Sequence, residues 1–97
     1  MSTIIVLGAG MVGSTMAIDM AKKHSVTLSD FNKKALEKAV SKCNKLIPIQ
    51  LDVTNKAELQ KTIKPFDLVI CAVPGFLGFE TLKSIIEAGK DVIDISF

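Results

Sequence analysis

The sequence feature that most constrains the fold is the stretch from Thr3 to Gly13, TIIVLGAGMVG. A short apolar run, mostly β-branched, leads into the pattern G-x-G-x-x-G, and a helical apolar period follows. This is the order of a strand, a turn and a helix. Gly8 is expected to make the tight turn. Gly10 would let the backbone approach a diphosphate, and Gly13 would let the helix pack closely on the strand.

This turn predicts a phosphate-binding site at the start of the helix. The first N–H groups of a helix have no partner within it. Those of Met11 and Val12 would therefore hold a diphosphate at the positive end of the helix dipole. A dinucleotide or a related nucleotide is the expected ligand. The alternative is a glycine-rich turn with a purely structural role.

An acidic residue follows at the spacing expected of a ribose ligand. A second strand, expected over residues 25–29, ends at Asp30, 17 residues after Gly13. At an offset of roughly 20 residues, such an acid reaches the ribose hydroxyls of adenosine. The alternative roles for Asp30 are a helix N-cap or a turn. Because its negative charge would repel a 2′-phosphate, NAD is favoured over NADP, although Lys33 and Lys34 could offset that charge.

The rest of the sequence alternates between the apolar periods of helices and strands. Helices are expected over residues 11–23, 33–43 and 55–63, with a fourth from Phe76 to a C-terminal Gly89, and further strands over 46–51, 67–73 and 91–95. In the first helix, Val12, Met16 and Met20, with Ala17 beside them, form the apolar stripe. Five strands alternating with four helices predict an α/β fold, a doubly wound parallel sheet (Rossmann fold) that forms one domain over residues 1–97.

Pro48 predicts the position of the third strand in this sheet. Proline lacks the N–H that a central strand must donate, so the third strand is expected at an edge. The strand order 3-2-1-4-5 places the third strand at that edge, in agreement with the proline. The fourth strand is a nearly unbroken apolar run, which suits a strand covered by helices on both faces.

Asp52 and Val53 come directly after the third strand. In this fold the carboxyl end of that strand borders the adenine pocket. Asp52 would accept a hydrogen bond from the adenine amino group, and the Val53 backbone would meet the ring. An equally weighted and compatible alternative is that Asp52 or Thr54 caps the next helix.

Composition excludes several classes of function. All 12 basic residues among the 97 are lysines and the net charge is only +2, which weighs against nucleic-acid recognition. No apolar run approaches the roughly 18 residues of a membrane span, and no signal-peptide pattern opens the chain, so a cytoplasmic protein is expected. Cys43 and Cys71 are expected as buried, reduced thiols and His24 as a solvated residue. No metal site is predicted.

The end of the sequence suggests a domain cut from a longer chain. The fifth strand would present an unpaired edge, and the chain stops before a sixth strand, with Phe76, Leu77, Phe79 and Phe97 left uncovered near the crevice. We expect a homo-oligomer or self-association through this edge. No catalytic set is predicted. Asp94 and Ser96 could approach the nicotinamide, but Asp94 could equally cap a following helix.

Three stretches carry a resemblance to a known family. Residues 6–13, 71–78 and 89–97 resemble the saccharopine dehydrogenase family, with the lysine 6-dehydrogenase-like branch nearest. The resemblance implies an oxidoreductase that uses a pyridine nucleotide at an amine or imine carbon of a small amino-acid substrate. A larger second domain would supply substrate binding and much of the dimer contact.

The resemblance also implies roles for particular residues. The glycine turn with Met11 and Val12 would carry the diphosphate, and Asp30 the adenosine ribose. Asp52 and Val53 would carry the adenine. The nicotinamide-side ribose would fall to three residues after the fourth strand, Ala72, Val73 and Pro74.

Two other classes of function have a similar motif. A regulatory nucleotide-sensing module of the potassium-transport type also has a glycine turn and a ribose acid, but it catalyses nothing. Its later strands do not usually carry Val-Pro-Gly-Phe and Asp-Ile-Ser, which are found here. In an S-adenosylmethionine-dependent methyltransferase an acid after the second strand also binds a ribose. The closely spaced G-x-G-x-x-G, suited to a diphosphate, argues against that class.

Overall fold

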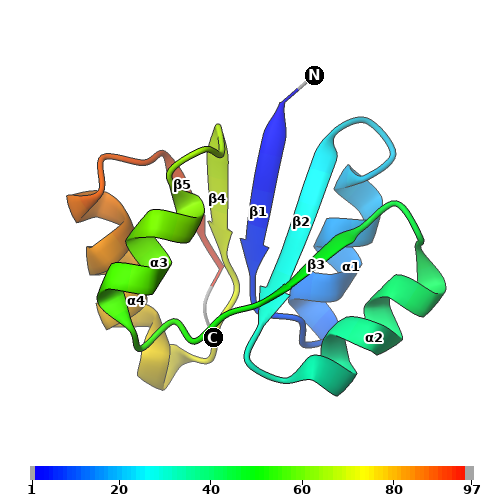
Figure 1. Ribbon diagram of the computed structural model, residues 1–97, viewed down its shortest axis with the longest axis horizontal. Helices are drawn as coiled ribbons and strands as arrows, with labels where there is room; N and C mark the ends of the chain where they lie inside the picture. The colour runs from blue at the N-terminus through cyan, green and yellow to red at the C-terminus, as the bar shows by residue number, and fades with distance from the viewer. Residues whose placement is uncertain (1, 96–97) are drawn as a thin grey trace.

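The computed structural model describes residues 2–95, which form one parallel sheet flanked by helices (Figure 1). The elements in chain order are β1 (Thr3–Leu7), α1 (Met11–Met20), β2 (Ser25–Asp30), α2 (Lys33–Lys42), β3 (Ile47–Gln50), α3 (Lys56–Ile63), β4 (Leu68–Cys71), α4 (Gly75–Glu87) and β5 (Val92–Asp94). The strand order is β3-β2-β1-β4-β5, and every pair is parallel. The predicted fold class and strand order are confirmed.

The core consists of two hydrophobic layers, one on each face of the sheet. Alternate residues of β1 point to opposite faces, so Ile4 and Val6 join one layer and Ile5 and Leu7 the other. Helices α1 and α2 cover the first face and α3 and α4 the second (Figure 1). Because both faces are covered, β1 and β4 are almost wholly apolar.

Helix α1 packs on the sheet through small residues. Gly13, Ala17 and Ala21 are buried at intervals of four residues. The predicted stripe is therefore wrong in part: Val12 is 44% exposed, while Met16 is only half-buried. A helix that approaches a sheet closely needs small side chains at the contact, and the larger apolar residues lie beside the contact.

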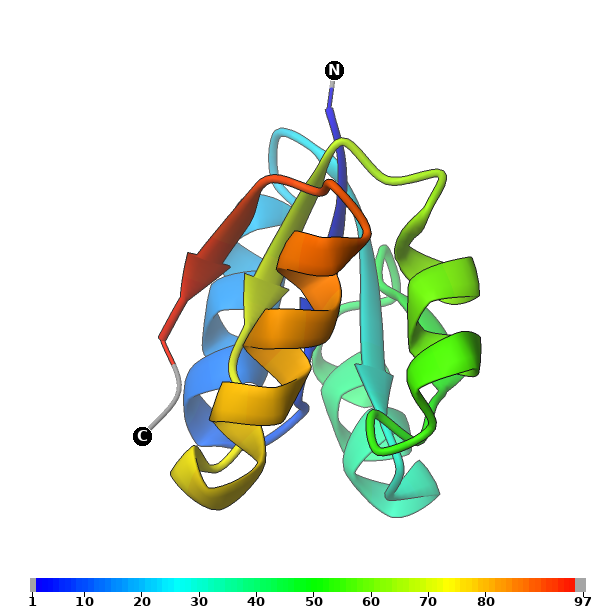
Figure 2. The same ribbon diagram turned by 90° about the vertical axis from the view of Figure 1, so that its left-hand side faces the viewer.

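The two edge strands differ in how their edges are protected. The Leu51 N–H donates to Asp30 O of β2 at 3.1 Å. Because successive backbone nitrogens of a strand point in opposite directions, the nitrogen of Pro48, three residues earlier, points away from β2. Pro48 therefore removes an outward donor from the edge of β3, as predicted. Strand β5 pairs with β4 and forms the other edge, beside α4 (Figure 2). Its Ile93 is 47% exposed.

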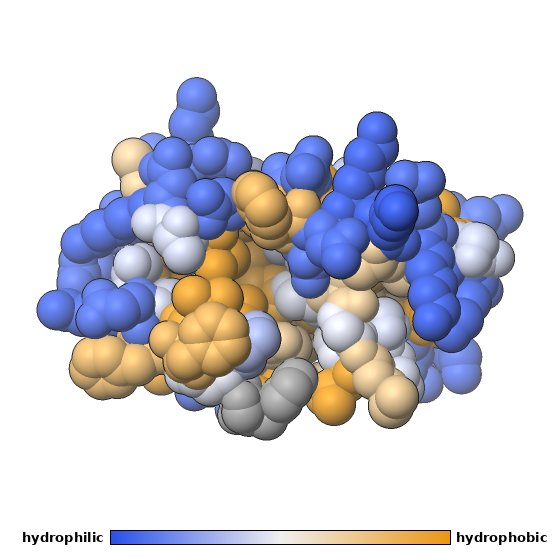
Figure 3. All heavy atoms as spheres, turned by 90° about the horizontal axis from the view of Figure 1, so that it is seen from below, coloured by the Kyte–Doolittle hydropathy of each residue, from blue (hydrophilic) through white to orange (hydrophobic). Residues whose placement is uncertain are grey.

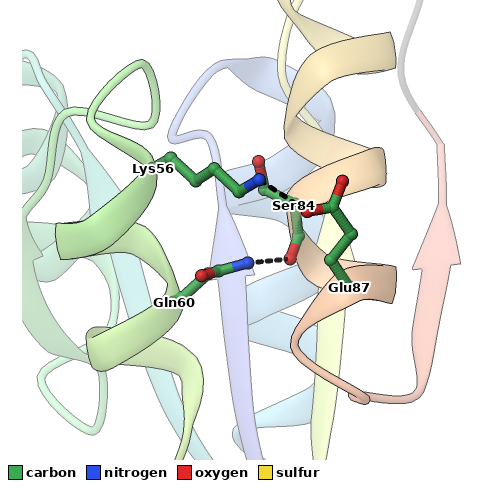
Figure 4. A network of polar contacts seen from close by, with 4 residues as sticks. All are labelled: Lys56, Gln60, Ser84 and Glu87. Atoms are coloured by element: carbon green, nitrogen blue, oxygen red, sulfur yellow. Dashed lines mark hydrogen bonds and ion pairs between the residues drawn. The ribbon is translucent and has the colours of Figure 1, made fainter.

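Polar contacts join the two helices on the second face (Figure 4). Lys56 of α3 pairs with Glu87 of α4 at 2.5 Å, and the Gln60 side chain donates to Ser84 O at 2.9 Å. The ion pair is largely exposed and contributes little, because solvent screens it.

The predicted C-terminal glycine of α4 is confirmed, since Gly89 has a φ of +75° one residue past the C-cap.

Candidate functional site

A cleft of about 380 Å³ opens at the end of the sheet where the strands finish. Its lining residues come from the carboxyl end of β2, from the turns after β1, β2, β3 and β4 and from the start of α4: Gly8, Ser29, Asp30, Phe31, Leu51, Asp52, Val53, Thr54, Val73, Pro74 and Leu77. Figure 3 views the molecule from this end, where hydrophobic side chains surround a hollow. The carboxyl end of an open α/β sheet, at the change in strand order, is where ligands of this architecture bind.

Two glycines of the turn are required by the protein itself. Gly8 has a φ of +112°, and a Cβ there would lie 2.3 Å from the Ala72 carbonyl oxygen. A Cβ at Gly13 would lie 1.9 Å from the Gly8 carbonyl oxygen. The roles predicted for these glycines, a tight turn and close packing of the helix, match this geometry.

Gly10 is different, because no atom of residues 2–95 lies within 4 Å of an added Cβ. It is the N-cap of α1, it makes no side-chain cap, and the first turn of α1 carries no acidic residue. The N–H groups of Met11 and Val12 precede the first bond of the helix, which runs from Ser14 N to Gly10 O at 2.9 Å. An uncapped helix N-terminus beside open space fits a diphosphate.

Asp30 is anchored by both of its carboxylate oxygens. Oδ2 accepts from the N–H of Ala9 in the glycine turn at 2.7 Å, and Oδ1 accepts from Asn32 N–H at 2.7 Å. The turn interpretation of Asp30 is thus correct, whereas its helix-cap interpretation is wrong. The cap of α2 is Asn32, whose side chain accepts from Lys34 N–H and Ala35 N–H. Each carboxylate oxygen keeps a second lone pair, so these bonds leave Asp30 able to accept from ribose hydroxyls.

Asp52 is held by the residue two positions further on. Its Oδ1 accepts from Thr54 N–H at 2.9 Å and from the Thr54 hydroxyl at 2.5 Å. The same two bonds, the hydroxyl first, lower the pKa of Asp52 below its usual value. The alternative that Asp52 or Thr54 caps α3 is wrong, because the Asn55 side chain accepts from Glu58 N–H and is the N-cap.

The three residues expected at the nicotinamide side lie at the end of β4. Val73 and Pro74 line the cleft, whereas Ala72 is buried beneath the glycine turn. Ala72 N–H donates to Leu7 O at 2.8 Å, which fixes the end of β4 against β1. Of the other predicted residues, Gly8, Asp30, Asp52 and Val53 also line the cleft. Gly10, Met11, Val12 and Gly13 lie on the neighbouring turn and helix.

Five residues that line the cleft were not among the predicted site residues: Ser29, Phe31, Leu51, Thr54 and Leu77. Phe31, 69% exposed, follows Asp30, and Leu77 comes from the first turn of α4. Thr54 was considered only as a helix cap. The signal for Phe31 was its place directly after Asp30 at a strand end. Leu77 was expected to lie uncovered near the crevice, but its place in the lining depends on how α4 packs.

Other side chains outside the cleft carry no evident chemistry. Among residues 2–95 there is no group of three or more His, Cys, Asp or Glu side chains that could hold a metal, and no helix long and apolar enough to cross a membrane. Cys43 is half-buried, Cys71 is buried, and they form no disulfide. His24 was expected to be solvated. Instead it is half-buried, and its Nδ1 is shielded without a hydrogen-bond partner among the described residues. Ser96 and Phe97 lie outside the described residues.

Comparison with solved structures places this architecture among dehydrogenases. Saccharopine dehydrogenase (L-Glu forming) from Saccharomyces cerevisiae is 26% identical over the whole chain, with a TM-score of 0.84, and the match covers 22% of that protein. A 3-hydroxyacyl-CoA dehydrogenase from Archaeoglobus fulgidus is 25% identical over the whole chain, with a TM-score of 0.80 and 34% of that protein covered. The present chain thus spans about a fifth to a third of these proteins.

More distant matches support the fold alone. A short-chain dehydrogenase/reductase from Veillonella parvula, solved with NADP, is 15% identical over 96% of this chain and 46% of its own, with a TM-score of 0.71. A sequence search of curated proteins found no match.

A family model described as "Saccharopine dehydrogenase NADP binding domain" matches residues 4–97. The chain therefore belongs to the family of saccharopine dehydrogenase NADP-binding domains, which makes it a dinucleotide-binding module.

Proposed function

We propose that residues 1–97 are the N-terminal cofactor-binding domain of an NAD(P)-dependent dehydrogenase that transfers hydride at an amine or imine carbon of an amino acid. The substrate class is supported by the family and by the name of the yeast structure. Catalytic residues would lie in a further domain, and a homo-oligomer in the cytoplasm is part of the same proposal. The domain assignment is supported by the small share of the dehydrogenases that the chain covers.

The observation that carries cofactor binding is the open space at Gly10. Gly8 and Gly13 are explained by protein packing, since a Cβ at either would meet backbone atoms. At position 10, by contrast, no atom in the described part of the chain would obstruct a Cβ. A ligand that must approach the backbone of residue 10 would account for the glycine. Because the start of α1 has no side-chain cap, its free N–H groups favour an anionic ligand. The bound diphosphate would accept from the N–H groups of Met11 and Val12.

The remaining parts of the cofactor would lie on the two sides of the glycine turn, with adenosine toward β2 and β3 and nicotinamide toward β4. Asp30 accepts from the hydroxyls of the adenosine ribose, and Asp52 and Val53 meet the adenine. Ala72, Val73 and Pro74 border the nicotinamide-side ribose, with the buried Ala72 contributing only backbone atoms. This assignment is supported by the strand order, which places Asp30 at the end of β2 and Asp52 after β3 on one side of β1, and Pro74 after β4 on the other side.

The choice between NAD and NADP rests on charge near the ribose. The family description names NADP, whereas the anchored carboxylate of Asp30 opposes a 2′-phosphate. Lys33 and Lys34 are exposed at the start of α2 and supply positive charge on the same side. We propose that NAD binds more tightly than NADP and that Asp30 sets this preference.

Calorimetric titration of the 97-residue chain with NAD, NADP, ADP-ribose and S-adenosylmethionine tests the proposal. NAD and ADP-ribose should bind and S-adenosylmethionine should not. Asp30→Asn keeps an acceptor for Ala9 N–H but removes the charge, so it should shift the NADP-to-NAD preference toward NADP by about tenfold, or about 1.4 kcal/mol. Binding of S-adenosylmethionine alone would refute the dinucleotide site. Tighter binding of NADP by the unaltered chain would refute the role of Asp30.

A further inference from the structure

Thr54 is the residue that orients Asp52 within the cleft. Both printed hydrogen bonds to the Asp52 carboxylate come from Thr54, and both end on the same oxygen, Oδ1. Among residues 2–95, no group donates a hydrogen bond to Oδ2. The two donors leave one face of the carboxylate fixed and the other oxygen available to a ligand. Asp52 is only half-buried, so without Thr54 its side chain would have freedom to rotate.

We infer that Thr54 is a positioning residue that makes the site selective for adenine over hypoxanthine. The inference rests on the proposed dinucleotide site. Adenine presents an amino group at position 6, which donates to a carboxylate oxygen. Hypoxanthine presents a carbonyl oxygen at that position, which a carboxylate repels, and its nearest donor is the neighbouring ring N–H. A carboxylate that is free to move reaches that N–H, whereas one held by Thr54 does not.

The side chain of Thr54, and not only its backbone, is needed for this selectivity. The hydroxyl bond of 2.5 Å is shorter than the backbone bond of 2.9 Å. Both donors bond the same ionised carboxylate oxygen, so both bonds are charge-assisted and stronger than bonds between neutral groups, and both are needed to fix its orientation. Loss of the hydroxyl leaves Asp52 with one N–H donor, about which the carboxylate can pivot.

The test compares two ligands that differ only at the base. The probes are NAD, or NADP if the chain binds it more tightly, and the corresponding deamino analogue, in which hypoxanthine replaces adenine. Calorimetry with the 97-residue chain should give tighter binding of the adenine form. Thr54→Val keeps the β-branched shape and removes the hydroxyl. It should lower the adenine preference about tenfold, the low end of the effect of losing one hydrogen bond to a charged group.

Three controls separate a positioning role from a structural one. Thr54→Ser restores the hydroxyl and should restore the preference. Thr62→Val makes the same chemical change on α3, away from the cleft, and should leave the preference unchanged. Thermal unfolding of each variant shows whether the fold is retained. A merely structural role for Thr54 would weaken both ligands equally.

The outcomes distinguish this inference from the proposed function. If the unaltered chain binds neither ligand, the dinucleotide site itself is refuted. If it binds the adenine form and Thr54→Val leaves the ratio of the two affinities unchanged, the dinucleotide site stands and the role of Thr54 is refuted. Equal affinities in the unaltered chain would overturn the inference in the same way.

Discussion

Alanine substitutions at Gly13 and Gly10 should separate the fold of the glycine turn from its binding role. At Gly13 the added Cβ would lie 1.9 Å from Gly8 O, 3.0 Å from Gly8 C and 3.3 Å from Ala72 Cβ. Cβ atoms essentially never approach other atoms closer than 3.0 Å, so α1 would have to move by about 1.1 Å, from 1.9 Å to 3.0 Å. The obstructing atom belongs to the backbone of the β1–α1 turn and cannot rotate away.

The free-energy cost follows from two opposing effects. Overpacking a closely packed contact costs about 1–3 kcal/mol, and a backbone obstruction belongs at the upper end of that range. Replacing glycine by alanine within a helix returns up to about 1 kcal/mol. Gly13→Ala should therefore destabilise the chain by about 2 kcal/mol. For a domain of this size that lowers the melting temperature by roughly 8–16 °C.

Gly10→Ala is the matched control because its Cβ enters open space. The backbone at position 10 has φ −69° and ψ −172°, a conformation that alanine adopts without strain. The weaker N-cap propensity of alanine and the smaller entropy of its unfolded chain oppose each other, so stability should change by less than about 0.5 kcal/mol. Dinucleotide binding should nevertheless be lost.

Thermal and urea unfolding of both variants, followed by circular dichroism, measure these effects, and calorimetry with NAD measures binding. A melting temperature for Gly13→Ala within about 2 °C of the unaltered chain would refute the packing argument. If Gly10→Ala is well folded and binds NAD normally, the diphosphate does not lie against the backbone of Gly10, and the proposed position of the diphosphate is refuted.

Two further predictions concern acid stability and self-association. Hydrogen bonds from the Thr3 backbone and side chain lower the pKa of Asp67 below its ordinary 3.8. These bonds therefore stabilise the folded chain above pH 3.8, and their contribution is lost as the pH falls through the lowered folded-state pKa. In Asp67→Asn the free energy of unfolding by urea should depend less on pH over that acid range. Its dependence on pH around 7 should be unchanged. The exposed edge of β5 should let the chain associate at high concentration, and Ile93→Lys should suppress this in sedimentation equilibrium. A monomer at millimolar concentration would contradict the second prediction, and an unchanged acid profile the first.

The strand order was predictable because two local features determine it. The glycine turn fixes a strand–helix crossover at the start of the chain, and Pro48 excludes the third strand from the interior. Element ends were predictable only to within a few residues. Helix α1 was expected to extend to residue 23 but ends at Met20. Residues 21–23 form a turn instead, and Ala21 is the C-cap of α1.

The apolar stripe predicted for α1 was wrong in part because hydropathy does not indicate how closely a helix approaches the sheet. Ile86 of α4 is 59% exposed despite its hydropathy, because α4 packs through Gly78, Thr81, Ser84 and Ile85. Like the small residues of α1, three of these four have little hydropathy, yet they allow a close approach. The residues of these helices that contact the sheet have mostly small side chains, and a pattern of large apolar residues does not identify them.

The contacts that prepare the site were equally beyond a local sequence pattern. The bond from Ala9 N–H to Asp30 joins residues 21 positions apart and requires β1 and β2 to be neighbours in register. Asp52, by contrast, is held by Thr54 within the same turn. Both carboxylates are thus oriented by protein donors before any ligand arrives, which reduces the ordering cost of binding. Because Asp30 also ties the glycine turn to β2, its loss should disturb the diphosphate end of the site as well as the ribose end.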